Sequence, residues 1–154
     1  MIAKWRVGAK VARNRAMAQR PMTILLAEDD PNDADLIGIA LGRAGLPHTL
    51  QHVPDGEAAI SYLTGQEDFA NRNEFPRPDV VLLDLKMPRK DGLDVLQWLR
   101  AQGDYAGLPV IVLTSSDEPK DIKRAYELGA TSYLTKSATF QNVLELLAKL
   151  SPAR

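Results

Sequence analysis

The 154-residue sequence contains no cysteine. This absence excludes a disulfide framework and any metal site built on thiolates. Long apolar runs are also missing: the longest have about five residues, whereas a helix that crosses a membrane needs about 20. We therefore expect no membrane partner. Low-complexity segments and short repeats are absent too, and 45% hydrophobic residues suit one globular domain with a sizeable core. We expect no second domain after residue 150.

Acidic residues are absent from residues 1–21, a segment that carries six lysines and arginines. The remaining 133 residues hold the other 13 basic residues and all 20 acids, a net charge of −7. This asymmetry divides the chain into a basic N-terminal extension, residues 1–21, and an acidic domain, residues 22–154. The extension lacks the serines of a transit peptide and the apolar core of a secretory signal, and Met22 could equally be the natural start. The acidic domain argues against nucleic acid as the main ligand.

The stretch around Asp84 organises the domain. Four consecutive apolar residues, 80–83, suit a strand buried on both faces of a parallel sheet. Asp84 follows directly, and a Met-Pro pair and an Asp-Gly pair then turn the chain into a loop. Ligands of open α/β sheets bind at the carboxyl ends of the strands, so Asp84 is a candidate site residue. An isolated aspartate there is more often a turn residue, which is why the other strand ends matter.

Strand and helix patterns alternate five times. Apolar runs predict further strands at residues 23–27, 48–53, 108–113 and 131–135. Helical spacing predicts helices from Pro31 (with Asp30 as N-cap) to Gly45, around 59–63, around 93–102, from Pro119 to Gly129, and over 140–150. Residues 65–77 form a long polar connection. In the helix from Pro119 we place Ile122, Ala125 and Tyr126 on the inner face. The alternation predicts an α/β fold, a parallel sheet with helices on both faces.

Four of the five predicted strands end in charged or reactive residues, namely Glu28 with Asp29, Asp84, Thr114 and Lys136. Each has a simpler explanation by itself, as a helix start, a turn residue or a surface lysine. Because the carboxyl ends of parallel strands share one edge of the sheet, we expect these residues to converge.

The expected cluster fits phosphoryl transfer. Crowded carboxylates raise one another's pKa, and a hard divalent cation with oxygen ligands, usually Mg²⁺, relieves their repulsion. An aspartate is also a nucleophile toward phosphorus, and the transfer needs positive charge around the phosphoryl oxygens. Mg²⁺, Lys136 and the Thr114 hydroxyl would supply that charge and a hydrogen bond.

The sequence resembles the receiver domain of two-component response regulators over roughly residues 22–150. The resemblance rests on ILLAEDDP, VVLLDLKMPRKDG, VIVLTSS and SYLTK, which occur in the family's order and spacing. It implies the flavodoxin-like (βα)5 fold, a doubly wound parallel sheet of strand order 2-1-3-4-5. The EDDP opening, the HVPDGEAAISYL stretch and the long polar connection most resemble the small stand-alone regulators paired with bacterial phytochrome-type histidine kinases.

The resemblance also implies a role for each site residue: Asp84 as phosphoacceptor; Glu28, Asp29, Asp84 and the backbone carbonyl of Lys86 as Mg²⁺ ligands; Thr114 as switch hydroxyl; Tyr133 as switch aromatic; and Lys136 as partner of the phosphate. The positions two beyond the acceptor and two beyond the switch threonine tune hydrolysis in the family. In this chain they are Lys86 and Ser116, neither an acid nor an amide, so we expect a long-lived adduct. The family usually has a cis-proline after the lysine; residue 137 is serine, which leaves the geometry of that bond open.

By resemblance the chain is a cytoplasmic signalling protein rather than an enzyme. It would accept a phosphoryl group from a histidine kinase and present a changed surface. Because no output domain is recognisable, we predict a homodimer through the helix from Pro119, the strand 131–135 and the last helix. Tyr126, Tyr133 and Leu134 would lie near the edge of the sheet there.

Three other functions stay open. A Mg²⁺-dependent phosphatase with an aspartyl-phosphate intermediate typically has a second acid two residues after the nucleophile, where this chain has Lys86, and tends to carry a cap domain. A flavin- or nucleotide-binding domain needs a glycine-rich phosphate cradle, which residues 27–30 do not offer. A DNA-binding regulator would have only the basic extension for its DNA contacts.

Overall fold

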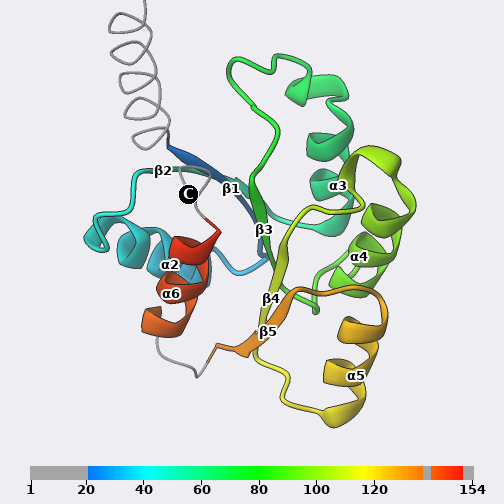
Figure 1. The fold of residues 1–154 in the computed structure, drawn as a ribbon. Coiled ribbons are helices and arrows are strands. Elements are labelled where there is room, and N and C mark those ends of the chain that lie inside the picture. Colours follow the sequence, from blue (N-terminus) through cyan, green and yellow to red (C-terminus); the bar gives the residue numbers. More distant parts are fainter. Residues whose placement is uncertain (1–20, 137–139, 151–154) are drawn as a thin grey trace, which may run out of the picture.

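The computed structural model describes residues 21–136 and 140–150 (Figure 1). Five parallel strands form one sheet in the order β2-β1-β3-β4-β5, which confirms the predicted fold class. The strands are β1 (Met22–Ala27), β2 (His48–Val53), β3 (Val80–Leu83), β4 (Val110–Thr114) and β5 (Ser132–Thr135). The helices are α2 (Pro31–Arg43), α3 (Gly56–Thr64), α4 (Gly92–Ala101), α5 (Pro119–Glu127) and α6 (Phe140–Lys149), with short 3-10 turns η1 (Glu67–Phe69) and η2 (Gly103–Tyr105).

The helices cover both faces of the sheet. α2 and α6 lie on one face, and α3, α4 and α5 lie on the other (Figure 1). Because side chains alternate along a strand, the central strands feed two apolar cores. Leu25 and Val112 pack in the core that includes α3 and α4, whereas Ile24 and Ile111 pack in the core that includes α2 and α6. Burial on both faces explains the continuous apolar runs. No helix within the described ranges is long and apolar enough to cross a membrane.

The strand register brings the ends of the central strands together. Ala27 of β1 pairs with Leu83 of β3, and Leu83 pairs with Val112 of β4. Helix α2 begins at Pro31, soon after β1. The predicted N-cap Asp30 stabilises this start, because its side chain accepts a hydrogen bond from the backbone N–H of Asn32 at 2.9 Å. The chain therefore leaves the sheet at neighbouring points along one edge.

Two local predictions are wrong. The strand expected at 108–113 begins at Val110 and includes Thr114, because Pro109 precedes it and has no N–H to donate to a ladder. Tyr126 is not on the inner face of α5: its side chain is 49% exposed. Asp121 and Ala125, one turn apart, are the buried residues of that helix.

The polar connection at 65–77 is packed against the domain. The Arg72 guanidinium donates to the backbone carbonyls of Tyr62 and Phe75, at 2.8 and 3.1 Å. The rings of Tyr62, Phe69 and Phe75 lie 5.2 to 6.1 Å apart, centroid to centroid. Aromatic pairs at these separations stabilise one another. The segment therefore helps to stabilise the domain although its sequence is mostly polar.

Two predictions concern parts of the chain outside the described residues. They are the conformation of the bond between Lys136 and residue 137 and the character of residues 1–20 in the basic extension, and both stay predictions.

Candidate functional site

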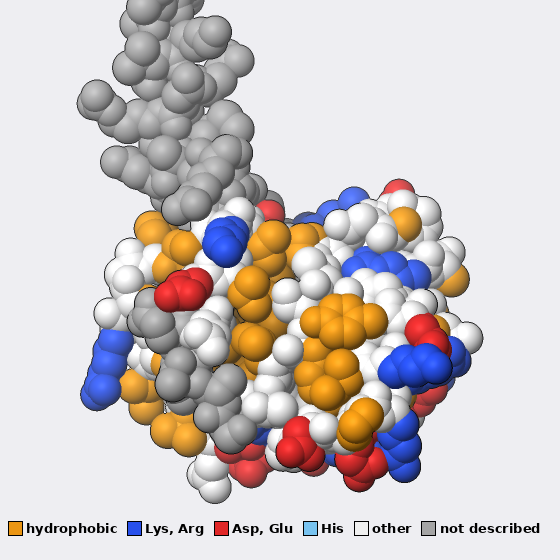
Figure 2. Space-filling view, turned by 60° about the horizontal axis from the view of Figure 1, so that its bottom comes forward, with side chains coloured by type: hydrophobic (Ala, Val, Ile, Leu, Met, Phe, Trp, Pro, Cys, Tyr) orange, Lys and Arg blue, Asp and Glu red, His pale blue; other side chains and the backbone are white. Residues whose placement is uncertain are grey.

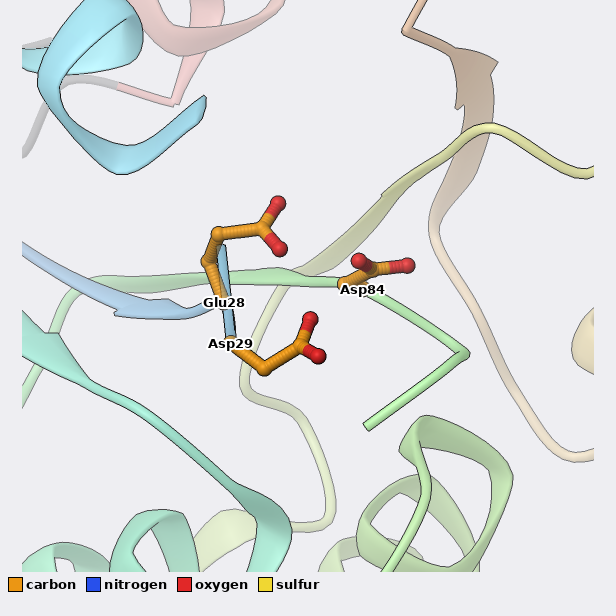
Figure 3. A group of neighbouring side chains, drawn as sticks. All are labelled: Glu28, Asp29 and Asp84. Carbon is orange, nitrogen blue, oxygen red and sulfur yellow. The ribbon is translucent and has the colours of Figure 1, made fainter. Parts of the chain in front are cut away.

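Three carboxylates meet at the edge of the sheet where β1 and β3 end. Glu28 and Asp29 follow β1, Asp84 follows β3, and one oxygen of each lies within 4.8 Å of the others. The three side chains reach into the same space (Figure 3). Glu28 and Asp84 are 1% and 5% exposed, while Asp29 is open to solvent. The structure thus brings together these residues from separate parts of the sequence.

Lys136, from the end of β5, reaches the same cluster. Its Nζ lies 2.6 Å from Glu28 Oε1, 2.7 Å from Asp33 Oδ2 and 3.1 Å from Asp84 Oδ2. The side chain of Lys136 is only 21% exposed. A compact ammonium with three donors suits this arrangement, since it can donate to all three carboxylates at once.

Asp33 is a site residue that the sequence analysis missed. It lies in the first turn of α2, and its carboxylate is held by Lys136. The available signal was its place in a helix that starts directly after the acidic pair Glu28 and Asp29. By helix geometry alone, however, an aspartate there is explained by its favourable interaction with the helix dipole.

The electrostatics of the cluster follow from burial and crowding. Burial, together with the nearby Asp84, raises the pKa of Glu28 to about 7, although Lys136 acts in the opposite direction. Burial would lower the pKa of Lys136, but its hydrogen bonds to Asp33, Glu28 and Asp84 outweigh burial and raise that pKa. With one ammonium among these carboxylates, the site can accommodate more positive charge.

Thr114 and Tyr133 lie beside the cluster, toward β4 and β5. Thr114 is fully buried at the end of β4. Tyr133 is partly buried on β5, and its hydroxyl donates to the backbone carbonyl of Ser116 at 2.7 Å. Burial raises the pKa of the Tyr133 hydroxyl, which therefore stays protonated and able to donate. The predicted switch aromatic is thus attached to the loop that follows Thr114.

The loop after β3 is held closely against its surroundings. The Lys86 N–H donates to Asp84 Oδ1 at 3.3 Å. A Cβ added to Gly92 would lie 2.3 Å from the backbone oxygen of Asp84, and one added to Gly56 would lie 2.1 Å from the backbone oxygen of Lys90. Only glycine fits at these two positions, so the loop that carries Lys86 is fixed by backbone contacts.

The donor set fits a hard divalent cation. Carboxylate oxygens are the ligands that Mg²⁺ and similar ions prefer, and three of them converge from Glu28, Asp29 and Asp84. Asp29 is exposed, so the cluster meets solvent on that side. The site is therefore chemically suited to a divalent metal.

Comparison with known sequences gives one consistent result. The family model described as the response regulator receiver domain matches residues 24–148. The response regulator Rcp1 of Synechocystis sp. is 37% identical over 127 residues, which cover 82% of this chain and 84% of that protein.

Solved structures agree with this result. The Mn²⁺-bound form of Rcp1 has a TM-score of 0.72 and 35% identity, covering 84% of this chain and 91% of that chain. The phosphorylated cyanobacterial phytochrome response regulator RcpA gives 0.74 and 35%, covering 85% and 91%. The bacteriophytochrome response regulator RtBRR gives 0.74 and 40%, covering 85% and 78%. The predicted likeness to phytochrome response regulators is confirmed.

Proposed function

We propose, since the chain belongs to the response regulator receiver family, that it accepts a phosphoryl group on Asp84. Proteins of this family are phosphoacceptors in two-component signalling, and so is this chain. One observation carries the assignment to Asp84: its buried carboxylate lies at the end of a central strand, inside the cluster, with the Lys136 ammonium at 3.1 Å.

In the proposed reaction, an oxygen of Asp84 attacks the phosphorus of a phosphohistidine. The new O–P bond forms as the P–N bond breaks, and the leaving imidazole keeps the electron pair and takes up a proton. Lys136 places positive charge where the phosphoryl oxygens come to lie, which is what this transfer mainly requires. The Thr114 hydroxyl would donate to one of these oxygens and act as the switch. The Tyr133 side chain would then change its position together with Thr114.

We assign Mg²⁺ as the working ion, held by Glu28, Asp29, Asp84 and the backbone carbonyl of Lys86. The donor chemistry supports a divalent metal, and Rcp1 has a Mn²⁺-bound form. A bound divalent cation would neutralise phosphoryl oxygens and screen the carboxylates from one another. The chain itself keeps the carboxylates of Glu28 and Asp84 buried at the site, with the positive charge of Lys136 beside them.

As a response regulator, the chain has a histidine kinase as its partner. We further propose that this kinase is of the phytochrome type, because RcpA and RtBRR are both described as phytochrome response regulators. The proposed site of action is the cytoplasm, where a histidine kinase obtains its phosphoryl group from ATP.

The test is phosphorylation of Asp84→Asn with acetyl phosphate and Mg²⁺, read by intact mass. The amide keeps the shape of the side chain but is no nucleophile, so the variant should show no adduct while the parent does. Asp104→Asn, an exposed aspartate remote from the site, is the control and should be phosphorylated like the parent. An undiminished adduct on Asp84→Asn would refute the assignment of Asp84 as the phosphoacceptor.

We also propose a homodimer through α5, β5 and α6. β5 is an edge strand, and exposed edges are usually covered or paired. Tyr126 is exposed beside it, and Figure 2 shows hydrophobic side chains gathered on the face that carries these elements. Aromatic side chains are favoured at the centres of interfaces. The Tyr126 hydroxyl accepts a hydrogen bond from the backbone N–H of Tyr133 at 3.1 Å, which favours contact through side chains over strand pairing between copies.

Sedimentation tests the dimer. A twofold contact uses the same patch twice, so Tyr126→Asp should give monomers that still accept phosphate. Ile39→Asp, at an exposed position on α2 across the sheet, should leave the dimer intact. A parent protein that is monomeric at tens of micromolar, with and without phosphodonor, would rule the dimer out.

A further inference from the structure

Asp121 is a buried carboxylate outside the cluster around Asp84. It lies in the first turn of α5 and is 8% exposed. A buried carboxylate is unfavourable unless it is paired or hydrogen-bonded, and Asp121 has two partners. The Ser116 hydroxyl donates to its Oδ2 at 2.5 Å, and Lys86 Nζ lies 3.8 Å from the same oxygen.

The two partners come from the two loops that flank the acceptor. Lys86 lies two residues after Asp84 in the loop that follows β3, and Ser116 lies two residues after Thr114 in the loop that follows β4. β3 and β4 are neighbours in the sheet, so these loops leave it side by side. Asp121 therefore connects both loops at one side of the acceptor.

Helix capping does not explain this arrangement. A carboxylate at the third position of a helix commonly reaches back to the N–H of the N-cap residue. In α5 the N-cap is Glu118, and its N–H points to Ser116 Oγ at 3.4 Å. Asp121 instead accepts a hydrogen bond from the Ser116 hydroxyl, while the Tyr133 hydroxyl donates to the Ser116 carbonyl. Ser116 is thus held through its hydroxyl by Asp121 and through its backbone by the switch aromatic.

We infer that Asp121 is a positioning residue for the acceptor site: it holds Ser116 and Lys86 together, closes the β4 side of the site against water, and prolongs the life of the phosphoryl adduct. The inference rests on the proposed function of Asp84. The adduct decays when a water oxygen attacks phosphorus and the bond from phosphorus to the Asp84 oxygen breaks. This leaves inorganic phosphate and the Asp84 carboxylate, with release of a proton. While Ser116 donates to Asp121, the loop after β4 is held beside the acceptor, and loss of this hydrogen bond admits the attacking water.

The experiment measures adduct decay. Parent and Asp121→Ala are loaded with acetyl phosphate and Mg²⁺, the donor is removed, and the remaining adduct is followed by intact mass. We expect Asp121→Ala to shorten the half-life about fivefold, the effect of losing about 1 kcal/mol of hydrogen bonding at the site. Asp117→Ala removes an exposed aspartate of the same loop and should decay like the parent. Equal half-lives for Asp121→Ala and the parent would overturn the inference.

A second background separates positioning from a general loss of stability. In a chain that already carries Lys86→Ala and Ser116→Ala, adding Asp121→Ala should not shorten the half-life further, because both partners are gone. The same shortening in that background contradicts the inference. Should Asp121→Ala fail to fold, Ser116→Ala should shorten the half-life and Ser116→Thr, which restores the hydroxyl, should recover it. Equal decay of those two variants likewise contradicts it. A parent without any adduct would instead overturn the role of Asp84.

Discussion

Replacing Lys136 by methionine should make the folded protein depend on a cation. The Lys136 ammonium contacts Glu28, Asp33 and Asp84 at 2.6, 2.7 and 3.1 Å. Methionine has a similar length and fills the same space without charge. The variant therefore leaves three carboxylates facing one another with no neutralising group from β5.

The expected loss of stability follows from the burial of these groups. Breaking a buried ion pair by removing one partner costs roughly 3–5 kcal/mol. Because the side chains of Lys136 and Asp33 are 21% and 32% exposed, water screens part of this, and we expect a loss of about 2–3 kcal/mol in metal-free buffer at pH 8. Mg²⁺ in excess should reduce the gap between variant and parent, because an ion that binds only the folded state stabilises it.

A lower pH should also reduce the difference in stability between Lys136→Met and the parent. The pKa of Glu28 is raised from 4.5 to about 7 in the folded protein. In that interval the folded state binds a proton that the unfolded chain does not, so the destabilisation from Glu28 is complete above pH 7 and fades as pH falls. Without Lys136, which lowers this pKa, the uptake of the proton shifts to still higher pH. The variant should thus gain more stability than the parent between pH 8 and pH 6.

Urea unfolding at pH 6 and pH 8, with and without Mg²⁺, measures these differences. Lys120→Met is the matched control, because Lys120 is 79% exposed and pairs with Glu118 at the surface; exposed pairs contribute about 0–1 kcal/mol. If Lys136→Met is as stable as the parent at pH 8 without metal, the ammonium does not neutralise the cluster, and its role as counter-charge is refuted.

Further outcomes are expected. Asp29→Ala should weaken Mg²⁺ binding about tenfold or more in a calorimetric titration, and unchanged affinity would contradict its role as a ligand. Removal of residues 1–21 should leave phosphorylation by acetyl phosphate intact, with the same gain in mass, since no proposed site residue lies there; loss of the adduct would show that the segment contacts the site. Ser116→Glu and Lys86→Asn should each change the decay rate of the adduct, and parent-like decay of both would refute their tuning role. Gly92→Ala should cost about 2–4 kcal/mol in urea unfolding, because its Cβ would meet the Asp84 backbone at 2.3 Å, and a parent-like midpoint would show that the loop has room.

The strand ends were predictable because of how a parallel sheet is buried. A strand covered on both faces is apolar throughout, so the first charged residue after it marks the edge of the sheet. β5, whose residues are only partly buried, does not follow this rule, but β1 and β3 do, and their ends locate Glu28 and Asp84 without knowledge of any contact. Their convergence then depends only on the strands being parallel and adjacent, which the strand–helix alternation implies.

Contacts made by helix residues were not predictable in the same way. Asp33 and Lys136 are 103 positions apart, and their meeting depends on how α2 lies over the sheet relative to β5. The orientation of Tyr126 shows the same difficulty. Ala125 and Tyr126 are adjacent and both apolar enough for the interior, but only Ala125 is buried. Helical spacing gives the width of an apolar face, and packing decides where that face is centred.

Two helices of this protein share a beginning that combines structural and site functions. α2 starts Pro-Asn-Asp and α5 starts Pro-Lys-Asp, so in both an aspartate is the third residue after the turn. At the same position of α4, Asp94 accepts from the N–H of its own N-cap residue and completes a capping box. Asp33 instead binds Lys136 at the end of β5, and Asp121 accepts from Ser116 in the loop just before its own helix. The third residue therefore caps its own helix in α4, whereas in α2 and α5 it accepts a hydrogen bond from a side chain outside the helix.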